Sequence, residues 1–202
     1  MQYYNFENAE YLMRQIVNKN HEQAYFRDIA VHNGTKCACD GYRLLTILSE
    51  NAKPWDFSAV YFDADGGNNG KSAIGRVFDA REKCSSPQII SKEEAARIII
   101  STDAAKIDYN RRNEDEKSEI ASDIIVCFNA KSESADSETV TGFNSKYIEE
   151  TIKFAMCSND ESIEIYFCGS LSPLIIKSGR LYAAVLPVKA RSKQVQRHVI
   201  RI

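Results

Sequence analysis

The amino-acid sequence predicts an α+β protein in which two β-α-β-β-β halves pack as one repeat, with a mixed insertion between them. An amphipathic helical period occurs near each end of the chain, and three strand-like segments separated by turn residues follow each period. The same order of elements therefore occurs twice. This order indicates an internal structural repeat, although the two halves share few identical residues.

The first half of the expected repeat is residues 1–52. Its helix is predicted by apolar residues spaced as one helix face, namely Ala9, Leu12, Met13, Ile16 and Val17. Asn8 is placed to cap this helix. The expected strands are residues 2–6 before the helix and 25–32, 35–40 and 42–48 after it. Asn33-Gly34 is a hairpin-turn dipeptide and should join two of them.

The second half is residues 139–190. A strand over 139–143 leads into a helix over 145–157, and Asn144 is its expected cap. The helix carries an inner face made of Tyr147, Ile148, Thr151, Ile152 and Ala155. Three strands are expected after it, over 162–168, 174–177 and 181–188.

Residues 53–138 fit neither half and are expected to form the insertion. Strand-like runs lie at 55–63, 74–78 and 123–128. Ser91 and Glu94 form a capping-box pattern that predicts a helix through Ile100, with Ile90 as its hydrophobic staple. The charge-dense stretch 103–119 and the serine-rich, acidic stretch 130–138 are expected to be exposed.

An alternative division of the chain makes two shorter repeats that meet near residue 102. The second of them would need an opening helix from 103–119, which offers a poor apolar face. Residues 191–202 form a basic C-terminal tail in either division. This tail contacts DNA in one interpretation, and in the other Val195, Val199 and Ile202 form an edge strand.

Composition favours a globular protein of the cytoplasm. The 202 residues are 44% hydrophobic and 10% aromatic, which is enough for a packed core. No apolar run reaches the roughly 18 residues of a membrane helix, and the N-terminus lacks the pattern of a signal peptide. The net charge of −2 argues against a protein that coats nucleic acid through bulk charge alone, but it does not exclude a local basic surface.

The cysteines are expected to be reduced thiols of the core. The six are Cys37, Cys39, Cys84, Cys127, Cys157 and Cys168. None forms a C-x-x-C pair and several lie in apolar runs, which favours thiols over disulfides. Cys37 and Cys39 share one strand face, yet His32 is not spaced to complete a zinc site with them. No metal or other cofactor is therefore expected.

Neither of two enzyme classes is well supported. Residues 65–72 nearly match the phosphate-binding loop G-x-x-x-x-G-K-S, but Asp65 replaces the first glycine and would bring a carboxylate close to phosphate. His21, His32 and His198 belong to no recognisable pairing of nucleophile and base. A non-catalytic protein is expected, and a nucleotide-binding protein is the weaker alternative.

Segments from the early and late parts of the chain, taken in order, resemble the bacterial DNA sliding-clamp family, the beta subunit of DNA polymerase III. Cys39-Asp-Gly-Tyr-Arg-Leu44 is similar to that family's A-T-D-G-H-R-L, with Cys39 replacing Thr and Tyr42 replacing His. Gly142-Phe-Asn-Ser-Lys-Tyr-Ile148 is similar to its helix entry G-F-N-x-x-Y-L. Ser172-Pro-Leu-Ile-Ile176 and Tyr182 with Val185-Leu-Pro-Val188 are similar to its last two strands.

The resemblance implies a non-catalytic protein that binds duplex DNA without sequence specificity and tethers replication or repair partners. In this family the repeats close into a ring and helices line the hole. The implied DNA contacts are cations on the outward faces of the two helices, namely Arg14, Lys19, Lys146 and Lys153. The alternative is an ordinary solvated helix face, because Glu149 and Glu150 lie beside the last two cations.

The resemblance also implies a pocket for peptides of DNA polymerase or other partners. Its residues would be Gly41, Tyr42, Arg43 and Leu44 from the early segment and Val185, Leu186 and Pro187 from the late one. Leu44 and Leu186 would supply apolar walls, and Arg43 a hydrogen-bond donor. The alternative assigns Gly41 to a turn, the two leucines to the core, and Arg43 to the solvated surface.

A single repeat cannot encircle DNA, so a working clamp is expected to be a homo-oligomer assembled head to tail. The early D-G-Y-R-L segment of one protomer would then meet the late V-L-P-V segment of the next. The alternative is a clamp-fold protein-interaction module that forms no ring.

Overall fold

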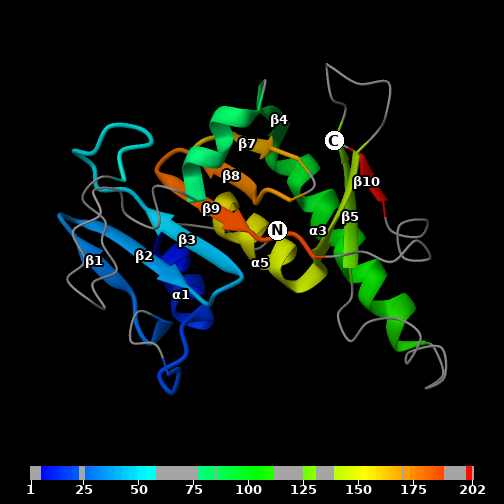
Figure 1. The fold of residues 1–202 in the computed structure, drawn as a ribbon, viewed down its shortest axis with the longest axis horizontal. Helices are drawn as coiled ribbons and strands as arrows, with labels where there is room; N and C mark the ends of the chain where they lie inside the picture. Colours follow the sequence, from blue (N-terminus) through cyan, green and yellow to red (C-terminus); the bar gives the residue numbers. More distant parts are fainter. Residues whose placement is uncertain are drawn as a thin grey trace.

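A seven-stranded antiparallel sheet forms the centre of the molecule in the computed structural model (Figure 1). The structure describes residues 6–22, 26–57, 77–84, 86–111, 125–130, 139–169, 171–188 and 199–201. The strands of the sheet are β1 (Ala30–His32), β2 (Thr35–Cys39), β3 (Arg43–Ile47), β4 (Gln88–Ser91), β7 (Ser162–Phe167), β8 (Leu174–Ser178) and β9 (Leu181–Val185). Their order across the sheet is β1-β2-β3-β9-β8-β7-β4.

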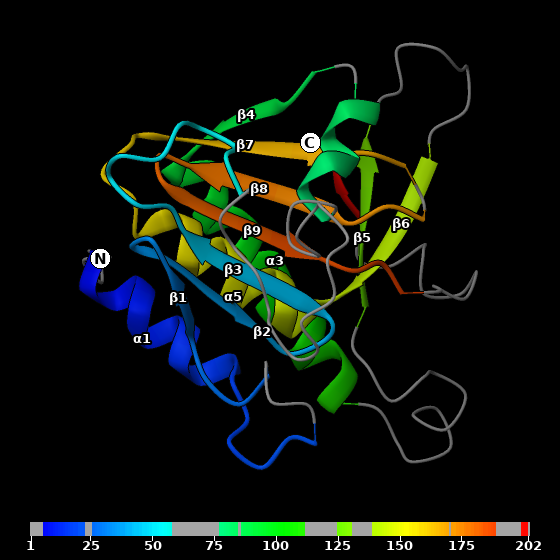
Figure 2. The ribbon, with the colours of Figure 1, turned by 60° about the vertical axis from the view of Figure 1, so that its left-hand side comes forward.

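Three helices cover one face of this sheet. They are α1 (Phe6–Ile16), α3 (Lys92–Asn110) and α5 (Ser145–Met156). Figure 2 shows α3 and α5 behind the sheet, and α5 packs against β8 and β9 between the other two helices. Within the described ranges, no helix combines the length and apolar character needed to cross a bilayer.

The sheet is buried on both faces, because successive side chains of each strand point to opposite faces and both sets are apolar. Leu45 and Ala183 belong to the core beneath the helices. Their neighbours Leu44 and Ala184 belong to a second apolar cluster on the opposite face. Residues around Phe57 and the 3₁₀ turn η2 (Asp79–Lys83) cover this second face. The central strands are therefore apolar at nearly every position.

The predicted α+β class and the two halves packed as one unit are confirmed. The first half supplies α1, β1, β2 and β3, and the second supplies β6 (Thr139–Asn144), α5, β7, β8 and β9. The halves join where β3 pairs with β9, with Arg43 opposite Val185. The strand expected over 2–6 lies outside the described residues, apart from Phe6, which opens α1.

A smaller three-stranded sheet lies beside α3, at the right of Figure 1. Its order is β10-β5-β6, with β5 at Ile125–Ala130 and β10 at Val199–Arg201. β5 corresponds to the run predicted over 123–128. β10 pairs in parallel with β5, which confirms an edge strand for residues 199–201 of the basic tail.

The N-terminal caps of α3 and α5 are as predicted. The Ser91 side chain accepts a hydrogen bond from the Glu94 N–H, and the Glu94 carboxylate accepts one from the Ser91 N–H at 2.7 Å. Glu94 is exposed, and these hydrogen bonds from Ser91 lower the pKa of its carboxyl. Asn144 accepts from the N–H groups of Lys146 and Tyr147 at 3.0 and 3.4 Å. Both helices therefore begin where the side-chain pattern indicated.

Several element boundaries differ from the prediction. α1 begins at Phe6, so Asn8 lies inside the helix and does not cap it. Residues 26–29 are not a strand, and this stretch instead bonds the segment after α1, with the Asn18 N–H donating to the Phe26 carbonyl at 2.8 Å. β9 stops at Val185, two residues before Pro187, which has no N–H for a ladder. Residues 77–78 are helical where a strand was expected.

Residues 88–110, within the predicted insertion, extend the same two layers as the halves. β4 pairs with β7 at the sheet edge, and α3 packs along α5. α3 also runs to Asn110, well past Ile100, because Thr102 and Ala105 are buried. Residues 103–110 are therefore helical, and apart from Ala105 they are exposed or partly exposed, as predicted. Residues 55–57 form no strand, and the strand predicted over 58–63 and the phosphate-loop match at 65–72 lie outside the described residues.

The prediction of reduced thiols is wrong for one pair, since Cys84 and Cys168 form a disulfide. The fold brings their Cα atoms to 4.8 Å across a sequence separation of 84 residues, which no local pattern reveals. Cys37, Cys39 and Cys157 are free thiols. Burial raises the pKa of Cys37 to about 12 and that of Cys39 and Cys157 to about 11, so all three stay protonated near neutral pH.

Candidate functional site

The D-G-Y-R-L segment forms a tight turn between β2 and β3. The Asp40 carboxylate accepts hydrogen bonds from the Tyr42 and Arg43 N–H groups at 3.0 and 2.9 Å. Gly41 adopts a φ of +89°, which a side chain would strain. Asp40 and Gly41 therefore fix the conformation of the turn, and Tyr42 projects from it.

The late segment lies directly beside this turn in the same chain. Arg43 and Val185 are paired residues of β3 and β9. The Leu186 N–H then donates to the Tyr42 carbonyl at 2.8 Å, and the Val188 N–H donates to the Gly142 carbonyl at 2.9 Å. The expectation that these segments meet between two protomers is wrong, because the β3–β9 ladder already joins them within one chain.

Arg43 is neither solvated nor open to a ligand in the way the sequence suggested. Its side chain is 5% exposed, and its Nε donates to Asp40 at 2.8 Å. A second guanidinium nitrogen pairs with Glu150 of α5. The guanidinium carbon lies 4.6 Å from the ring centroid of Tyr147, also on α5. Arg43 therefore fastens the turn to the central helix.

Leu44 and Val185 are also buried, in the two opposite faces of the sheet. The structure therefore brings all seven residues of the predicted pocket together but places them in two groups. Gly41, Arg43, Leu44 and Val185 shape and support the turn, whereas Tyr42, Leu186 and Pro187 are accessible to solvent.

An exposed apolar surface remains where the two segments meet. Tyr42 is 59% exposed and Leu186 is 42% exposed, and Pro187 follows them at partial exposure. The Tyr42 ring stacks on Tyr147, with 5.9 Å between centroids and 24° between planes. These four residues are called the Tyr42–Leu186 surface below. Tyr147 was assigned to the inner face of its helix, and only its place beside Tyr42 reveals this second contact.

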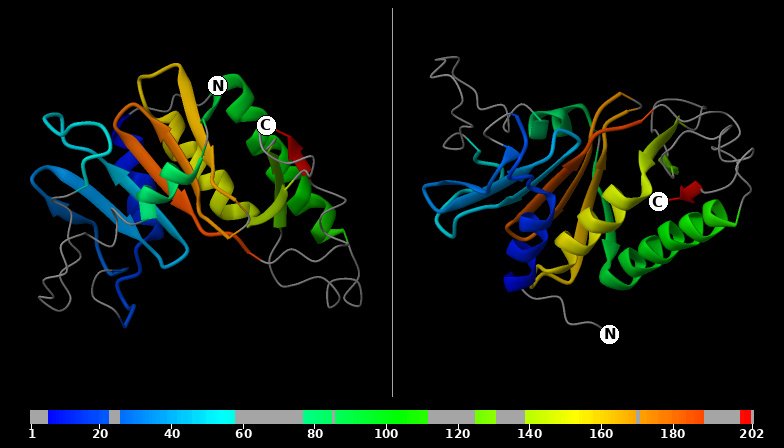
Figure 3. Two further views of the ribbon diagram at one scale, coloured as in Figure 1. Left: turned by 45° about the horizontal axis from the view of Figure 1, so that its top comes forward. Right: turned by 90° about the horizontal axis from the view of Figure 1, so that it is seen from below.

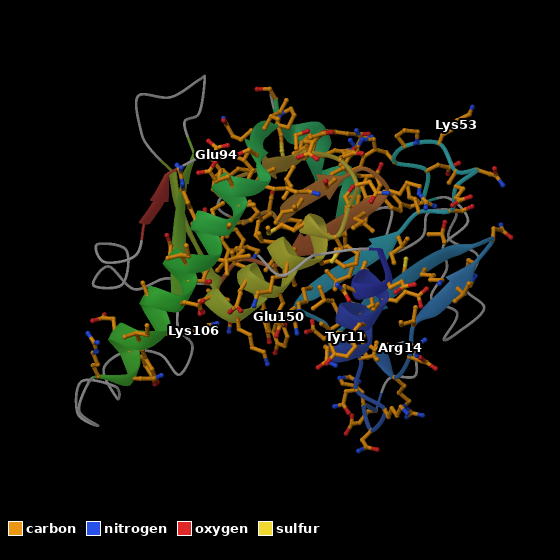
Figure 4. All side chains as sticks on the ribbon, turned by 180° about the vertical axis from the view of Figure 1, so that it is seen from behind. Tyr11, Arg14, Lys53, Glu94, Lys106 and Glu150 are labelled. Carbon is orange, nitrogen blue, oxygen red and sulfur yellow. A yellow bond between two sulfur atoms is a disulfide. The ribbon has the colours of Figure 1, made fainter. Side chains whose placement is uncertain are left out.

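The four predicted DNA-contact residues differ in exposure and in ion pairing, and Figure 4 shows Arg14 on α1. Arg14 is exposed on α1, with Glu10 at 3.9 Å, and Lys146 is exposed in the first turn of α5. Lys19 is exposed but follows the end of α1 at Ile16, so it is not on the helix. Lys153 is half-buried and paired with Glu149.

Acidic residues balance the cations of the helix layer. They outnumber basic residues on α1 and α3 and equal them on α5. Burial opposes ionisation of Glu149, but the hydrogen bonds from Lys106 and Lys153 outweigh it and hold its pKa below the usual value. The pair with Lys106 also ties α5 to α3. Among the described residues, the helix side thus has isolated cations and no continuous basic stripe.

Comparison with solved structures identifies the fold. A putative DNA polymerase III beta subunit from Eubacterium rectale superposes with a TM-score of 0.57 at 12% sequence identity, covering 91% of this chain and 64% of that one. The Helicobacter pylori beta clamp bound to a DNA ligase peptide gives 0.56 at 11% identity, with coverage of 91% and 63%. The Bacillus subtilis sliding clamp gives 0.53 at 14% identity, with the same coverage.

These likenesses show that the chain has the sliding-clamp fold. The chain spans less than two thirds of the length of those clamps. No protein-family model matches the chain, and no curated protein matches it either. At sequence identities of 11–14%, the similarity supports the fold alone. Activity and partners have to be inferred from the site.

Proposed function

We propose that this chain is a non-catalytic, sliding-clamp-like protein that tethers partner proteins through a peptide bound at the Tyr42–Leu186 surface. The observation that carries the proposal is the backbone hydrogen bond from Leu186 to Tyr42, which brings the two clamp-like segments together with the Tyr42 and Leu186 side chains exposed. The Helicobacter pylori clamp of similar fold holds a DNA ligase peptide. Partners of the present chain would be DNA polymerases or other proteins with clamp-binding peptides.

The surface has the chemistry that a short apolar peptide requires. Tyr42 and Tyr147 present stacked rings at low conformational cost, and Leu186 adds an aliphatic contact beside them. Arg43 acts from below as a positioning residue, because it holds the turn against α5 through Glu150. A peptide would gain affinity from the exposed side chains of Tyr42 and Leu186, while the ion pair of Arg43 with Glu150 keeps the turn in place.

Replacing Leu186 with aspartate is expected to weaken peptide binding at least tenfold. The substitution puts a charge at the centre of an apolar contact, and truncation of such anchors alone costs about 1–2 kcal/mol or more. Fluorescence anisotropy with the labelled DNA ligase peptide measures the change. Leu171→Asp is the matched control, because Leu171 is 93% exposed on a different loop and should leave affinity unchanged.

The companion variant Tyr42→Ala removes the stacked ring and is expected to give a loss of similar size. The proposal fails if the wild-type chain shows no binding of the peptide at millimolar concentration. It also fails if Leu186→Asp and Leu171→Asp bind the peptide equally well. Circular dichroism of each variant confirms that the fold is retained.

Duplex DNA is the second candidate partner, and the exposed cations Arg14, Lys19 and Lys146 favour it. With about three phosphate contacts, affinity for a 30-base-pair duplex should fall roughly 40-fold between 50 and 200 mM salt. Lys146→Glu should weaken binding more than Lys53→Glu, which reverses a charge away from the helices (Figure 4). Equal effects of the two substitutions would show that the helix side does not bind duplex DNA specifically.

Encircling DNA would require more than one copy of this fold, since a single two-layer unit cannot close around a duplex. Among the described residues the sheet ends at β1 and β4, and either edge can accept a strand from a second copy. Sedimentation at micromolar concentration distinguishes the cases. A closed oligomer supports a ring, whereas a monomer that ignores DNA at low salt leaves a peptide-binding module without a ring.

A further inference from the structure

The face of the sheet opposite the helices has a cover of its own. Residues 77–84 lie on this face, on the other side of the sheet from α5, as the right-hand view of Figure 3 shows. Phe78 is fully buried there against the second apolar cluster. The segment is therefore a small lid over the middle of the sheet.

Aromatic contacts hold this lid from within. Phe78 stacks on Phe57 with 4.4 Å between ring centroids. Trp55 meets Tyr182 edge-on at 4.8 Å, and the guanidinium of Arg81 lies 4.1 Å from the Trp55 ring centroid. The backbone N–H of Trp55 also donates to the Tyr182 hydroxyl at 3.3 Å. Opening of residues 77–84 would therefore change the surroundings of Trp55.

The disulfide fastens the end of the lid to the sheet. Cys84 follows η2, and Cys168 comes directly after β7. Both residues are partly exposed, so a reductant can reach the bond. Cys37 and Cys157, by contrast, are buried and protonated. The sequence predicts a cytoplasmic location, and disulfides in reducing compartments are mostly transient and redox-sensing.

We propose that the Cys84–Cys168 disulfide is a redox-controlled latch on residues 77–84, opened by a dithiol reductant. A thiolate of the reductant attacks one of the two sulfurs and releases the other cysteine as a thiol. The second thiol of the reductant then breaks the mixed disulfide and closes its own. Two electrons and two protons pass to Cys84 and Cys168, and the dithiol is oxidised to a disulfide.

Reduction frees the Cys84 end of the lid, which then opens by giving up side-chain packing that includes Val77, Phe78 and Ala80. Opening exposes Trp55 and Tyr182. The sheet itself does not depend on the bond, because β7, β8 and β9 are joined by their own ladders and backed by the helix-side core. The proposal does not rest on peptide binding at the Tyr42–Leu186 surface.

Trp55 is the single tryptophan of the chain, which makes its fluorescence a specific probe of this face. Treating the oxidised protein with excess dithiothreitol should increase quenching of Trp55 by acrylamide at least threefold and shift its emission to the red. Far-UV circular dichroism should stay the same. Alkylation followed by mass spectrometry should show that two further thiols, Cys84 and Cys168, become accessible on reduction.

The double variant Cys84→Ser/Cys168→Ser should show the quenching of the reduced protein without any reductant, and dithiothreitol should not change it further. The proposal is overturned if full reduction leaves Trp55 quenching unchanged, since the bond is then a static brace. It is also overturned if circular dichroism is lost together with the fluorescence change, or if both cysteines are alkylated before reduction.

Discussion

Replacing Arg43 with alanine is expected to lower the free energy of unfolding by about 3–5 kcal/mol. The Arg43 guanidinium is buried between the carboxylates of Asp40 and Glu150, which are themselves only partly exposed. Without it, two acidic groups face each other across a site that water reaches poorly. Urea denaturation followed by circular dichroism measures the loss.

Arg14→Ala is the control for this prediction. Arg14 is exposed and lies 3.9 Å from Glu10, so its removal should change stability by less than about 0.5 kcal/mol. The double variant Arg43→Ala/Glu150→Ala should recover part of the loss, because it removes one of the stranded carboxylates. A loss below 1 kcal/mol for Arg43→Ala would mean that the ion pair is solvated and does not fix the turn.

Phe154→Ala is expected to have an effect of similar size, about 3–5 kcal/mol. Phe154 lies on α5 and is fully buried, in the core shared by the helices and the sheet. Its removal leaves a cavity at the helix that contacts both neighbouring helices and the central strands β3, β8 and β9. Thermal and urea unfolding of the purified variant give the change.

Ile100→Ala offers a comparison on the neighbouring helix, because Ile100 is 66% exposed on α3. Its substitution should cost less than about 0.5 kcal/mol, since little apolar surface returns to water. Similar losses for the two variants would contradict the placement of α5 at the centre of the helix layer.

Local patterns predicted the elements whose stability is decided nearby. The helix at 145–156 was predicted from the Asn144 cap and the spacing of Ile148, Ile152 and Ala155, and the structure confirms the cap and the buried face. β4 was missed because four residues carry too little alternation to indicate a strand. Its partner β7 lies about 70 residues later in the chain. Phe154 was likewise missed, since α3 and α1 bury a second side of the helix that the sheet does not cover.

The site shows the same division between local and distant causes. The turn around Gly41 follows from its own residues, and the prediction that it would lie at a clamp-like surface rested on a resemblance. The Glu150 partner of Arg43 is 107 residues away and the partner of Cys84 is 84 residues away, so neither was visible in the sequence. Arg43 was consequently expected at the surface and Cys84 among the free thiols.

The ladder between β3 and β9 also governs the order in which the molecule can be completed during synthesis. Leu48, next to β3, bonds Arg180, which is 132 residues further along the chain. The ribosome needs on the order of ten seconds to make that stretch, and for this time the edge of β3 that pairs with β9 has no partner strand. An uncovered edge of this kind pairs readily with other chains. The nascent chain is therefore most prone to aggregate before β9 emerges from the ribosome.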